Sequence, residues 1–213
     1  MADDASAPPV RVRNRRGQGD RLRQEIVTAA TGLLDETGDE SAITLRSVAR
    51  RVGIAAPSIY RHFPDQPAVV LAVVRSAFAE LDERLRAAVD AAGRTPRERL
   101  LALCQAYLEF GRTRPGRYRT MFGGLWVPDL AAGSVTEEDM ATLGRQSMRR
   151  LAEALEACVG AGCSTSADVS ADAVALWLGL HGLAHQRAVS PSFPWPPDIA
   201  ERVVTALAHL TDA

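Results

Sequence analysis

The sequence predicts an all-α fold of about nine helices. Apolar residues recur at spacings of three and four along most of the chain, which is the period of a helix with one buried face. No segment of the sequence alternates apolar and polar residues with the period of two that marks a half-buried strand. Capping residues, prolines and glycines stand at the ends of the periodic segments, where helices begin and end.

The first helix is expected from about Gly19 to Thr37, because an apolar stripe runs through it and Gly38 follows. Residues 1–19 precede this helix and are rich in Pro, Gly, Arg and Asp without any apolar period. This composition predicts disorder, since too little apolar surface is present to offset the loss of chain entropy. The stripe consists of Leu22, Ile26, Ala30, Leu33 and Leu34.

Residues 44–63 predict two short helices joined by a tight turn. Thr44 is a good N-cap, and Gly53 ends the first helix where the backbone needs a positive φ. Pro57 falls in the first turn of the second helix, where its missing N–H costs little. Ala49 is small enough for the two helices to approach closely. The pattern is that of a helix-turn-helix.

The outward side of the second helix carries hydroxyl, aromatic, guanidinium and imidazole groups, from Ser58, Tyr60, Arg61 and His62. These groups suit the phosphates and base edges of a DNA groove. The spacing alone also fits an ordinary helical hairpin with a solvated polar face, because short helix-turn-helix patterns have false positives.

The segments Thr44–Ala49, Val52–Ile54 and Ser58–Pro64 resemble the N-terminal domain of TetR-type transcriptional regulators, over about residues 21–74. The resemblance implies that the helix beginning at Ala55 enters a major groove of DNA. The implied phosphate contacts come from Thr44, Arg46, Tyr60 and His62, and the candidates for base edges are Ala56, Ser58 and Arg61.

Two positions depart from the family's pattern. Ala55 stands where Ser or Thr usually caps the recognition helix, and losing that cap costs roughly 1 kcal/mol. Gln66 stands where the family often places a Lys that contacts phosphate. We therefore expect one phosphate contact of the family to be missing here.

Basic residues also gather just before the first helix. Residues 11–23 hold six arginines against the single acid Asp20, although the whole chain has a net charge of −1. A basic arm beside a helix-turn-helix can follow DNA phosphates or enter the minor groove. The same composition fits a solubilising tail, and the sequence leaves both interpretations open.

The remaining helices are expected at residues 65–91, 95–111, 115–122, 136–159, 170–189 and 198–210, with an apolar loop at 123–135. Thr95 and Thr136 each begin a capping box, and Asp198 is expected to cap the last helix. The stripe over 65–91 is longer than a small domain needs, so this helix should link the N-terminal domain to the remainder. In TetR-type regulators the helix at this position transmits ligand binding. The expected domains are a basic arm over 1–19, a DNA-binding domain over 20–66 and a helical domain over 67–213.

Composition and motifs narrow the function classes. The sequence has no run of eighteen apolar residues and no leader with a basic start and an apolar core, so we expect neither a membrane span nor a secretory signal. Its three cysteines indicate a reducing cytoplasm. His181 and His185 are four apart, but no Glu stands between them as in a zinc protease, and no nucleophile elbow or phosphate loop is found. We expect no metal, no cofactor and no enzymatic activity.

The C-terminal half holds aromatic and methionine side chains that suit a cavity for a small molecule. For any single one of these residues, a filled helical core is the simpler interpretation. The segment Trp177–Gly182 is similar to the Trp/His/Gly segment of one TetR C-terminal subfamily, which favours a pocket with His181 as its polar contact. The candidates are Tyr107, Phe110, Tyr118, Met121, Phe122, Trp126, Met148, Trp177 and His181.

The last two expected helices are candidates for a homodimer interface. A two-fold interface of four helices would resemble that of the family. Small residues that permit close approach and apolar residues that supply area are Gly179, Gly182, Ala184, Ile199, Val203, Leu207 and Leu210.

The sequence thus predicts a homodimeric repressor that binds an inverted-repeat DNA operator and leaves it when a small, largely apolar effector binds. One alternative is a DNA-binding dimer without an effector, controlled by its own concentration or by a protein partner. Another is a helical small-molecule-binding protein that has lost DNA binding, as the departures at Ala55 and Gln66 would allow.

Overall fold

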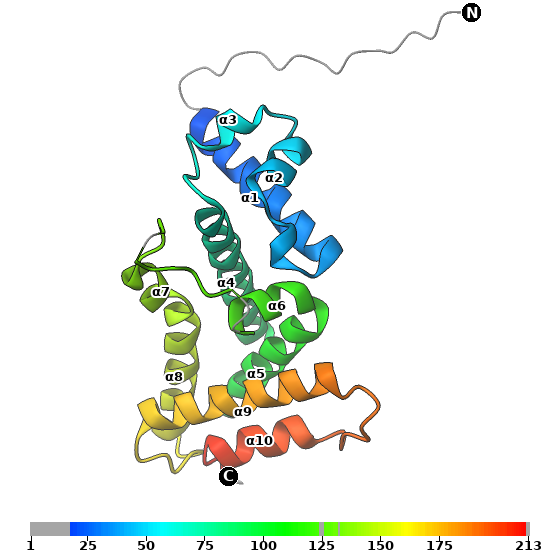
Figure 1. Ribbon diagram of the computed structural model, residues 1–213. Coiled ribbons are helices and arrows are strands. Elements are labelled where there is room, and N and C mark those ends of the chain that lie inside the picture. Colours follow the sequence, from blue (N-terminus) through cyan, green and yellow to red (C-terminus); the bar gives the residue numbers. More distant parts are fainter. Residues whose placement is uncertain (1–17, 124–125, 132, 212–213) are drawn as a thin grey trace, which may run out of the picture.

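The computed structural model describes residues 18–123, 126–131 and 133–211 of the chain (Figure 1). Within these ranges the chain is helical, with one isolated antiparallel bridge between Ser164 and Leu210 and no strand, so the all-α prediction is confirmed. Most of the expected N-terminal arm, residues 1–17, lies outside the described residues. The helices are α1 (Gln18–Thr37), the short 3-10 helix η1 (Glu40–Ala42), α2 (Leu45–Val52), α3 (Ala56–Ile59), α4 (Gln66–Ala91), α5 (Pro96–Thr113), α6 (Pro115–Phe122), α7 (Glu137–Thr142), α8 (Arg145–Gly160), α9 (Val169–Val189) and α10 (Ile199–Leu207).

Helices α1 to α3 and the first half of α4 enclose one apolar core. Helix α1 packs across α2 and α4, and Ile26, Leu34 and Phe63 are almost completely buried between them. Burying a side chain of this size contributes about 1.5–3 kcal/mol. The core therefore fixes the position of the α2–α3 pair against α1.

The α2–α3 pair has the predicted turn. The Thr44 hydroxyl accepts a hydrogen bond from the amide of Ser47 at 3.0 Å, and the Ser47 hydroxyl accepts one from the Thr44 amide. Gly53 follows with a φ of 73°, which confirms the need for glycine at this position. The Ile54 amide closes the turn on the carbonyl of Ala49 at 3.0 Å.

The second helix of the pair is shorter than predicted. Helix α3 ends at Ile59, and the chain continues in hydrogen-bonded turns in which the amides of His62 and Phe63 share the Ile59 carbonyl. Ala55 offers no side chain to cap the first amides, as expected from the sequence. Pro64 follows Phe63 and restricts the residue before it to extended backbone, so the helix has little room to extend.

Helix α4 runs through both halves of the molecule (Figure 1). Val69, Val70, Val73 and Val74 belong to the N-terminal core, whereas Leu81 and Leu85 belong to a second core in the C-terminal half. Phe78 packs against both cores. One rigid element therefore connects the helix-turn-helix to the rest of the protein.

The C-terminal core is built around α5, which contacts α4, α8 and α9. Leu100, Phe110, Leu155 and Leu176 are completely buried there. The predicted capping box at the start of α5 is present, because Thr95 accepts from the Glu98 amide while Glu98 accepts from the Thr95 amide. The corresponding box of Thr136 begins α7.

The single helix expected over residues 136–159 is two helices, α7 and α8, separated by Leu143 and Gly144. Leu143 is extended and Gly144 has a φ of 71°, a conformation that breaks a helix. A side-chain carbon at Gly144 would lie 2.9 Å from the Phe78 ring, so glycine also permits close packing on α4. The sequence showed the apolar period on both sides of the break, but this kink is set by the contact with α4.

Helices α9 and α10 lie side by side at one end of the molecule (Figure 1). Gly179 faces α10 of the same chain, since a side-chain carbon there would lie 2.4 Å from Leu207. Asp198 precedes α10 as predicted, but its carboxylate accepts from Arg202 and does not cap the helix amides. The last described residues pair with the α8–α9 connection, where the Thr211 amide donates to the Cys163 carbonyl.

Candidate DNA-binding surface and ligand cavity

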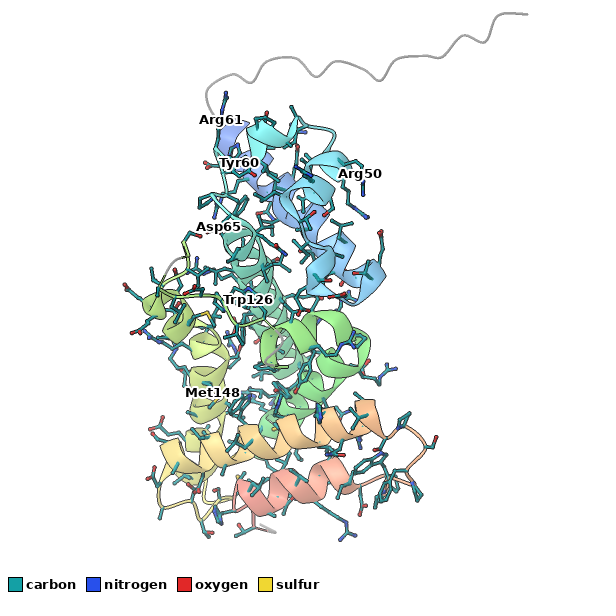
Figure 2. All side chains as sticks on the ribbon, in the orientation of Figure 1. Arg50, Tyr60, Arg61, Asp65, Trp126 and Met148 are labelled. Carbon is teal, nitrogen blue, oxygen red and sulfur yellow. The ribbon has the colours of Figure 1, made fainter. Side chains whose placement is uncertain are left out.

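The outer surface of α2 and α3 carries three arginines that have no acidic partner among the described residues. Arg46 and Arg50 are one turn apart on α2, and Arg61 lies just after α3; all three are exposed. Figure 2 shows Arg50, Tyr60 and Arg61 at the end of the molecule opposite α9 and α10. Guanidiniums without an acidic partner in the described part of the chain are available to neutralise phosphates.

Every residue that the sequence assigned to DNA contact lies on the protein surface. Thr44, Arg46, Ala55, Tyr60 and Arg61 are exposed, and the other three are half-buried. The half-buried residues are Ala56, Ser58 and His62.

Two arginines of the same region are already engaged, and they hold the surface in shape. The Arg23 guanidinium donates to the carbonyl of His62 at 2.6 Å and lies over the Phe63 ring, 4.2 Å from its centroid. Arg51 forms a bidentate salt bridge with Glu36, with N–O distances of 2.6 and 2.5 Å. The side-chain hydrogen bond from Arg51 lowers the pKa of Glu36, so this pair stays charged near neutral pH. These contacts tie the end of α3 and the end of α2 to α1.

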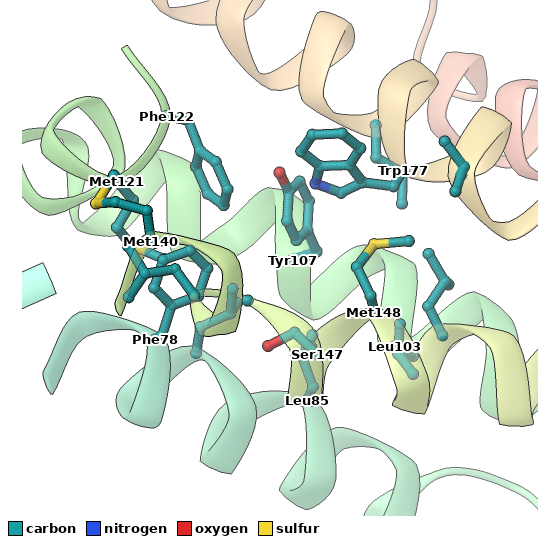
Figure 3. Close-up of a pocket in the computed structure, with 16 residues that line it drawn as sticks. Phe78, Leu85, Leu103, Tyr107, Met121, Phe122, Met140, Ser147, Met148 and Trp177 are labelled. Atoms are coloured by element: carbon teal, nitrogen blue, oxygen red, sulfur yellow. The ribbon is translucent and has the colours of Figure 1, made fainter. Parts of the chain in front are cut away.

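A cavity of about 420 Å³ lies in the C-terminal half, between α4, α5, α6, α7, α8 and α9 (Figure 3). Its volume is within the range of small-molecule sites. No Asp, Glu, Arg or His is among its sixteen lining residues, which are Phe78, Leu81, Leu85, Leu103, Tyr107, Met121, Phe122, Met140, Leu143, Gly144, Ser147, Met148, Leu151, Val174, Trp177 and Leu180.

Five of the nine predicted pocket residues line this cavity: Tyr107, Met121, Phe122, Met148 and Trp177. Phe110 does not, because it is fully buried in the core beneath Arg84, whose guanidinium lies 5.5 Å from the ring centroid. Trp126 packs against the N-terminal core instead. Tyr118 and His181 lie outside the lining and behind it.

Tyr118 and His181 belong to an aromatic layer that supports the cavity wall. The Tyr118 hydroxyl is 3.0 Å from that of Tyr107 and 2.8 Å from Nδ1 of His181. The imidazole also stacks on the ring of Trp177, with 5.8 Å between centroids. His181 was expected to contact a ligand, but its ring nitrogen bonds to Tyr118 instead. Through Tyr118, His181 helps to hold the Tyr107 side chain in the cavity wall.

Burial sets the protonation states of this layer. It raises the pKa of Tyr107 to about 12, although hydrogen bonds with Tyr118 and Trp177 act in the opposite direction. Burial likewise raises the pKa of Tyr118. Burial, with a smaller contribution from His185, lowers the pKa of His181. The chain of hydrogen bonds is therefore uncharged at neutral pH.

Several lining residues were not predicted from the sequence, for two different reasons. Phe78, Leu81 and Leu85 belong to the apolar stripe predicted over residues 65–91, but nothing in that stripe distinguishes a cavity wall from a packed core. Ser147 gave no signal at all, because a serine on a helix is usually solvated. Among the described residues its hydroxyl has no hydrogen-bond partner, and it lies among apolar side chains (Figure 3).

Helix α6 touches both the cavity and the N-terminal helices. At its end, Met121 and Phe122 line the cavity. Nearer its start, Arg117 donates to Asp35 of α1 at 2.9 and 2.5 Å and also to Glu80 of α4. A change in the shape of the cavity can thus reach α1 through one short helix.

A second connection runs from the α6–α7 loop to the start of α4. The Asp65 carboxylate, which caps α4 through the Ala68 amide at 2.9 Å, also accepts from the Ser134 hydroxyl at 2.7 Å. Burial alone would raise the pKa of Asp65, but these hydrogen bonds outweigh it and lower the pKa. Asp65 follows directly on the helix-turn-helix, so this contact joins the loop beside α7 to that motif.

The described ranges hold neither a membrane-spanning helix nor a metal-ligating cluster. No helix there has both the length and the apolar character to cross a bilayer. No three metal-ligating side chains gather among the same residues. The cysteines of this part of the chain, Cys104, Cys158 and Cys163, are buried thiols, and burial raises the pKa of Cys158 to about 12, which makes it a poor metal ligand.

Comparison with protein families matches both halves of the chain. Residues 26–73 match bacterial regulatory proteins of the tetR family, and residues 100–210 match the tetracyclin repressor-like C-terminal domain. The second match covers more than half of the chain. The chain belongs to the TetR family. It is therefore of the transcriptional-regulator class, and its α1–α3 region is the DNA-binding domain of that family.

Individual proteins and solved structures are also similar to the chain. The chain is 30% identical over 101 residues to the nucleoid occlusion factor SlmA of Vibrio atlanticus, covering 47% of this chain and 51% of that protein. The chain thus spans about half the length of the curated relatives it matches. A protein of unknown function from Rhodococcus sp. RHA1 has the same fold, with a TM-score of 0.71 at 27% identity over 88% of this chain and 91% of that one.

A further solved structure has the same fold. The transcriptional regulator FadR from Bacillus subtilis, in complex with stearoyl-CoA, superposes with a TM-score of 0.69 over 87% of this chain and 97% of that one. The identity is 13%, so the likeness concerns the fold alone.

Proposed function

We propose that this TetR-family protein is a homodimeric repressor that leaves an inverted-repeat operator when a small, largely apolar effector fills the cavity. The single observation that carries the proposal is the presence in one chain of a basic surface, whose arginines have no acidic partner among the described residues, and an apolar cavity, joined by α4 and α6. The rival regulator without an effector would have its core filled at this place, and a cavity of about 420 Å³ counts against it.

The DNA contact follows from the exposed groups of α2 and α3. Arg46, Arg50 and Tyr60 are suited to phosphates, whereas Ser58 and Arg61 are suited to base edges in the major groove. Arg50 is added here because it is exposed one turn beyond Arg46. A two-fold dimer would place two such surfaces in successive major grooves, roughly 34–36 Å apart.

The dimer is proposed to form through α9. Val174, Leu178 and Val189 are exposed apolar residues on one side of this helix, and Leu178 is 54% exposed. The α10 residues first considered for the interface lie against the chain's own core instead, so α9 supplies most of the apolar area. Gly182 lies on the same side, with open space where a side chain would be, and would let a partner helix approach closely.

Release of DNA is proposed to run through α6 and α4. An effector that pushes on Met121 or Phe122 moves the helix whose Arg117 holds α1. A shift of α1 changes the spacing of the two recognition surfaces in the dimer. An effector reverses a strong preference for the DNA-bound form only if it favours the released form by a large factor, about 10⁴ for a full reversal.

The DNA contact is tested by fluorescence anisotropy with a labelled duplex from upstream of the protein's own gene, measured over a range of salt concentrations. We expect sequence-dependent binding with a steep salt slope, and a loss of about 1–3 kcal/mol in Arg61→Ala. Arg202→Ala is the matched control, because Arg202 is exposed on α10 and bonded to Asp198. If Arg61→Ala binds as well as the wild type does, α3 does not enter the groove.

The dimer is tested by sedimentation velocity. Leu178→Asp should shift the protein towards monomer and weaken operator binding. Val127→Asp is the control, since Val127 is 78% exposed in the loop before α7 and far from α9 in sequence. A Leu178→Asp protein that stays dimeric would exclude this side of α9 as the interface.

A further inference from the structure

We infer that the cavity takes an uncharged, mostly apolar molecule of roughly 10 to 14 non-hydrogen atoms with one hydrogen-bonding oxygen, which Ser147 binds. This inference rests on the proposed function of the cavity as the effector site. It goes further by naming the chemical class of the effector and the residue that selects it.

The size limit follows from the volume. Water in the liquid occupies about 30 Å³ per non-hydrogen atom, and at the same share a cavity of about 420 Å³ corresponds to roughly 14 such atoms. Because the side chains make the cavity irregular, a ligand does not fill it completely. We therefore expect a ligand of roughly 10 to 14 non-hydrogen atoms. A stearoyl chain with its coenzyme, as bound by the FadR structure, is larger than this cavity.

The charge limit follows from the lining, in which no cationic or anionic side chain occurs. An ionised ligand group placed there would lose its hydration without gaining a counter-ion, which costs far more than a small ligand's contacts return. Two arginines on the neighbouring helices are engaged elsewhere, with Arg75 bonded to Asp139 at 2.5 Å and Arg150 to Asp82 at 3.0 Å. Phosphates and carboxylates are therefore excluded.

The polar requirement follows from three groups in the lining: the hydroxyls of Tyr107 and Ser147 and the indole N–H of Trp177. Tyr107 is already bonded to Tyr118, and the Trp177 indole lies close enough to the Tyr107 hydroxyl to influence its pKa. Ser147 alone among these three has a side chain with no partner in the described part of the chain. Its hydroxyl is thus available to a ligand oxygen.

The start of α8 strengthens this preference for an oxygen acceptor. Gly144, at the N-cap of α8, has no side chain to satisfy the first amides, and the Ser147 amide occupies the position that such a cap normally binds. Ser147, which lines the cavity, carries both this amide and the hydroxyl as hydrogen-bond donors. A ligand with a hydroxyl or carbonyl group satisfies them, whereas a pure hydrocarbon leaves the Ser147 hydroxyl unpaired.

The test uses two sets of matched probes with the full chain, in isothermal titration calorimetry at neutral pH. One set is 1-naphthol, naphthalene and 1-naphthoate, and the other is 1-decanol, decane and decanoate. For at least one set we expect the alcohol to bind about three- to tenfold more tightly than the hydrocarbon. We expect the carboxylate to bind at least a hundredfold more weakly than the alcohol.

Ser147→Ala should reduce the affinity for the alcohol to that of the hydrocarbon and leave the hydrocarbon affinity unchanged. Ser147→Thr keeps a hydroxyl and should restore the preference, which separates recognition from a loss of fold. Ser76→Ala is the control, because Ser76 is also on a helix but lines a different groove. An equal effect of Ser147→Ala on both probes would overturn the role of Ser147.

Failure of this inference and failure of the proposed function give different results. Binding of neither alcohol, or equal binding of a carboxylate, overturns the inference while DNA binding by the same sample persists. Tight binding of an alcohol that leaves the operator complex intact supports the inference and refutes effector-driven release.

Discussion

Replacing Arg117 by alanine should loosen the contact between α6 and α1. The Arg117 side chain is 16% exposed and holds Asp35 through two N–H···O contacts, at 2.9 and 2.5 Å, and also Glu80. After the substitution Glu80 keeps Arg84 and Arg114 as partners. Asp35 is left without its guanidinium, but it is 39% exposed and can be rehydrated in part.

These contacts set the size of the effect. Hydrogen bonds to charged groups contribute about 1.5–3 kcal/mol when buried, and exposure of Asp35 reduces this towards the value of a surface pair. We therefore expect Arg117→Ala to lower the free energy of unfolding by about 2 kcal/mol. For a chain of this size that corresponds to a fall in Tm of roughly 4–8 °C.

The assay is thermal unfolding followed by circular dichroism, together with operator binding in the presence and absence of an effector. Arg117→Lys keeps the charge but not the bidentate geometry, so its Tm should lie between those of the wild type and of Arg117→Ala. Arg112→Ala is the control, because Arg112 makes a similar two-pronged contact with Glu109 on one exposed helix face and joins no second element. If the Tm of Arg117→Ala lies within roughly 1 °C of the wild-type Tm, the contact does not hold α6 to α1.

Three further substitutions test the local geometry. Gly144→Ala should lower the free energy of unfolding by about 1–3 kcal/mol in urea titrations, because alanine is strained at a φ of 71° and its side chain would meet Phe78; no change would mean that α7 and α8 can rearrange freely. Because burial holds the pKa of His181 below its ordinary value near 6.5, the unfolded state takes up the proton first. Stability should therefore be complete above about pH 6.5 and fall as the pH drops below it, and His181→Asn, which can still accept from Tyr118, should flatten that slope in Tm measured against pH. Thr95→Ala removes the cap of α5 and should lower Tm by roughly 2–4 °C, and an unchanged Tm would show that the capping box adds nothing to this helix.

The helix-turn-helix was predictable because its determinants are local. Thr44 caps the helix that begins one residue later, and Gly53 adopts a positive φ that residues with a side chain rarely adopt. Such signals act over a few residues, so the sequence shows them directly. The length of α3 was overestimated because apolar spacing continues to Phe63 after the backbone has left the helix.

The cavity was predictable only in part. Aromatic and methionine residues marked the correct helices, but Phe110 and Tyr107 lie on the same helix and only Tyr107 faces the cavity. Which of them does so depends on how α5 is rotated against α4 and α9. Periodicity identifies a buried face, and it does not distinguish a face that meets other side chains from one that meets empty space.

The sequence by itself determined the all-α class, the helix-turn-helix and the starts of the capped helices, because each depends on contacts within a few residues. Tertiary structure alone decided the break at Gly144, the inward face of α10 and the position of Ser147 in an apolar cavity. Those features arise where helices distant in sequence meet, as when Phe78 of α4 packs on Gly144. The chemistry proposed for the effector therefore depends on the packing of six helices, which no single segment of the chain encodes.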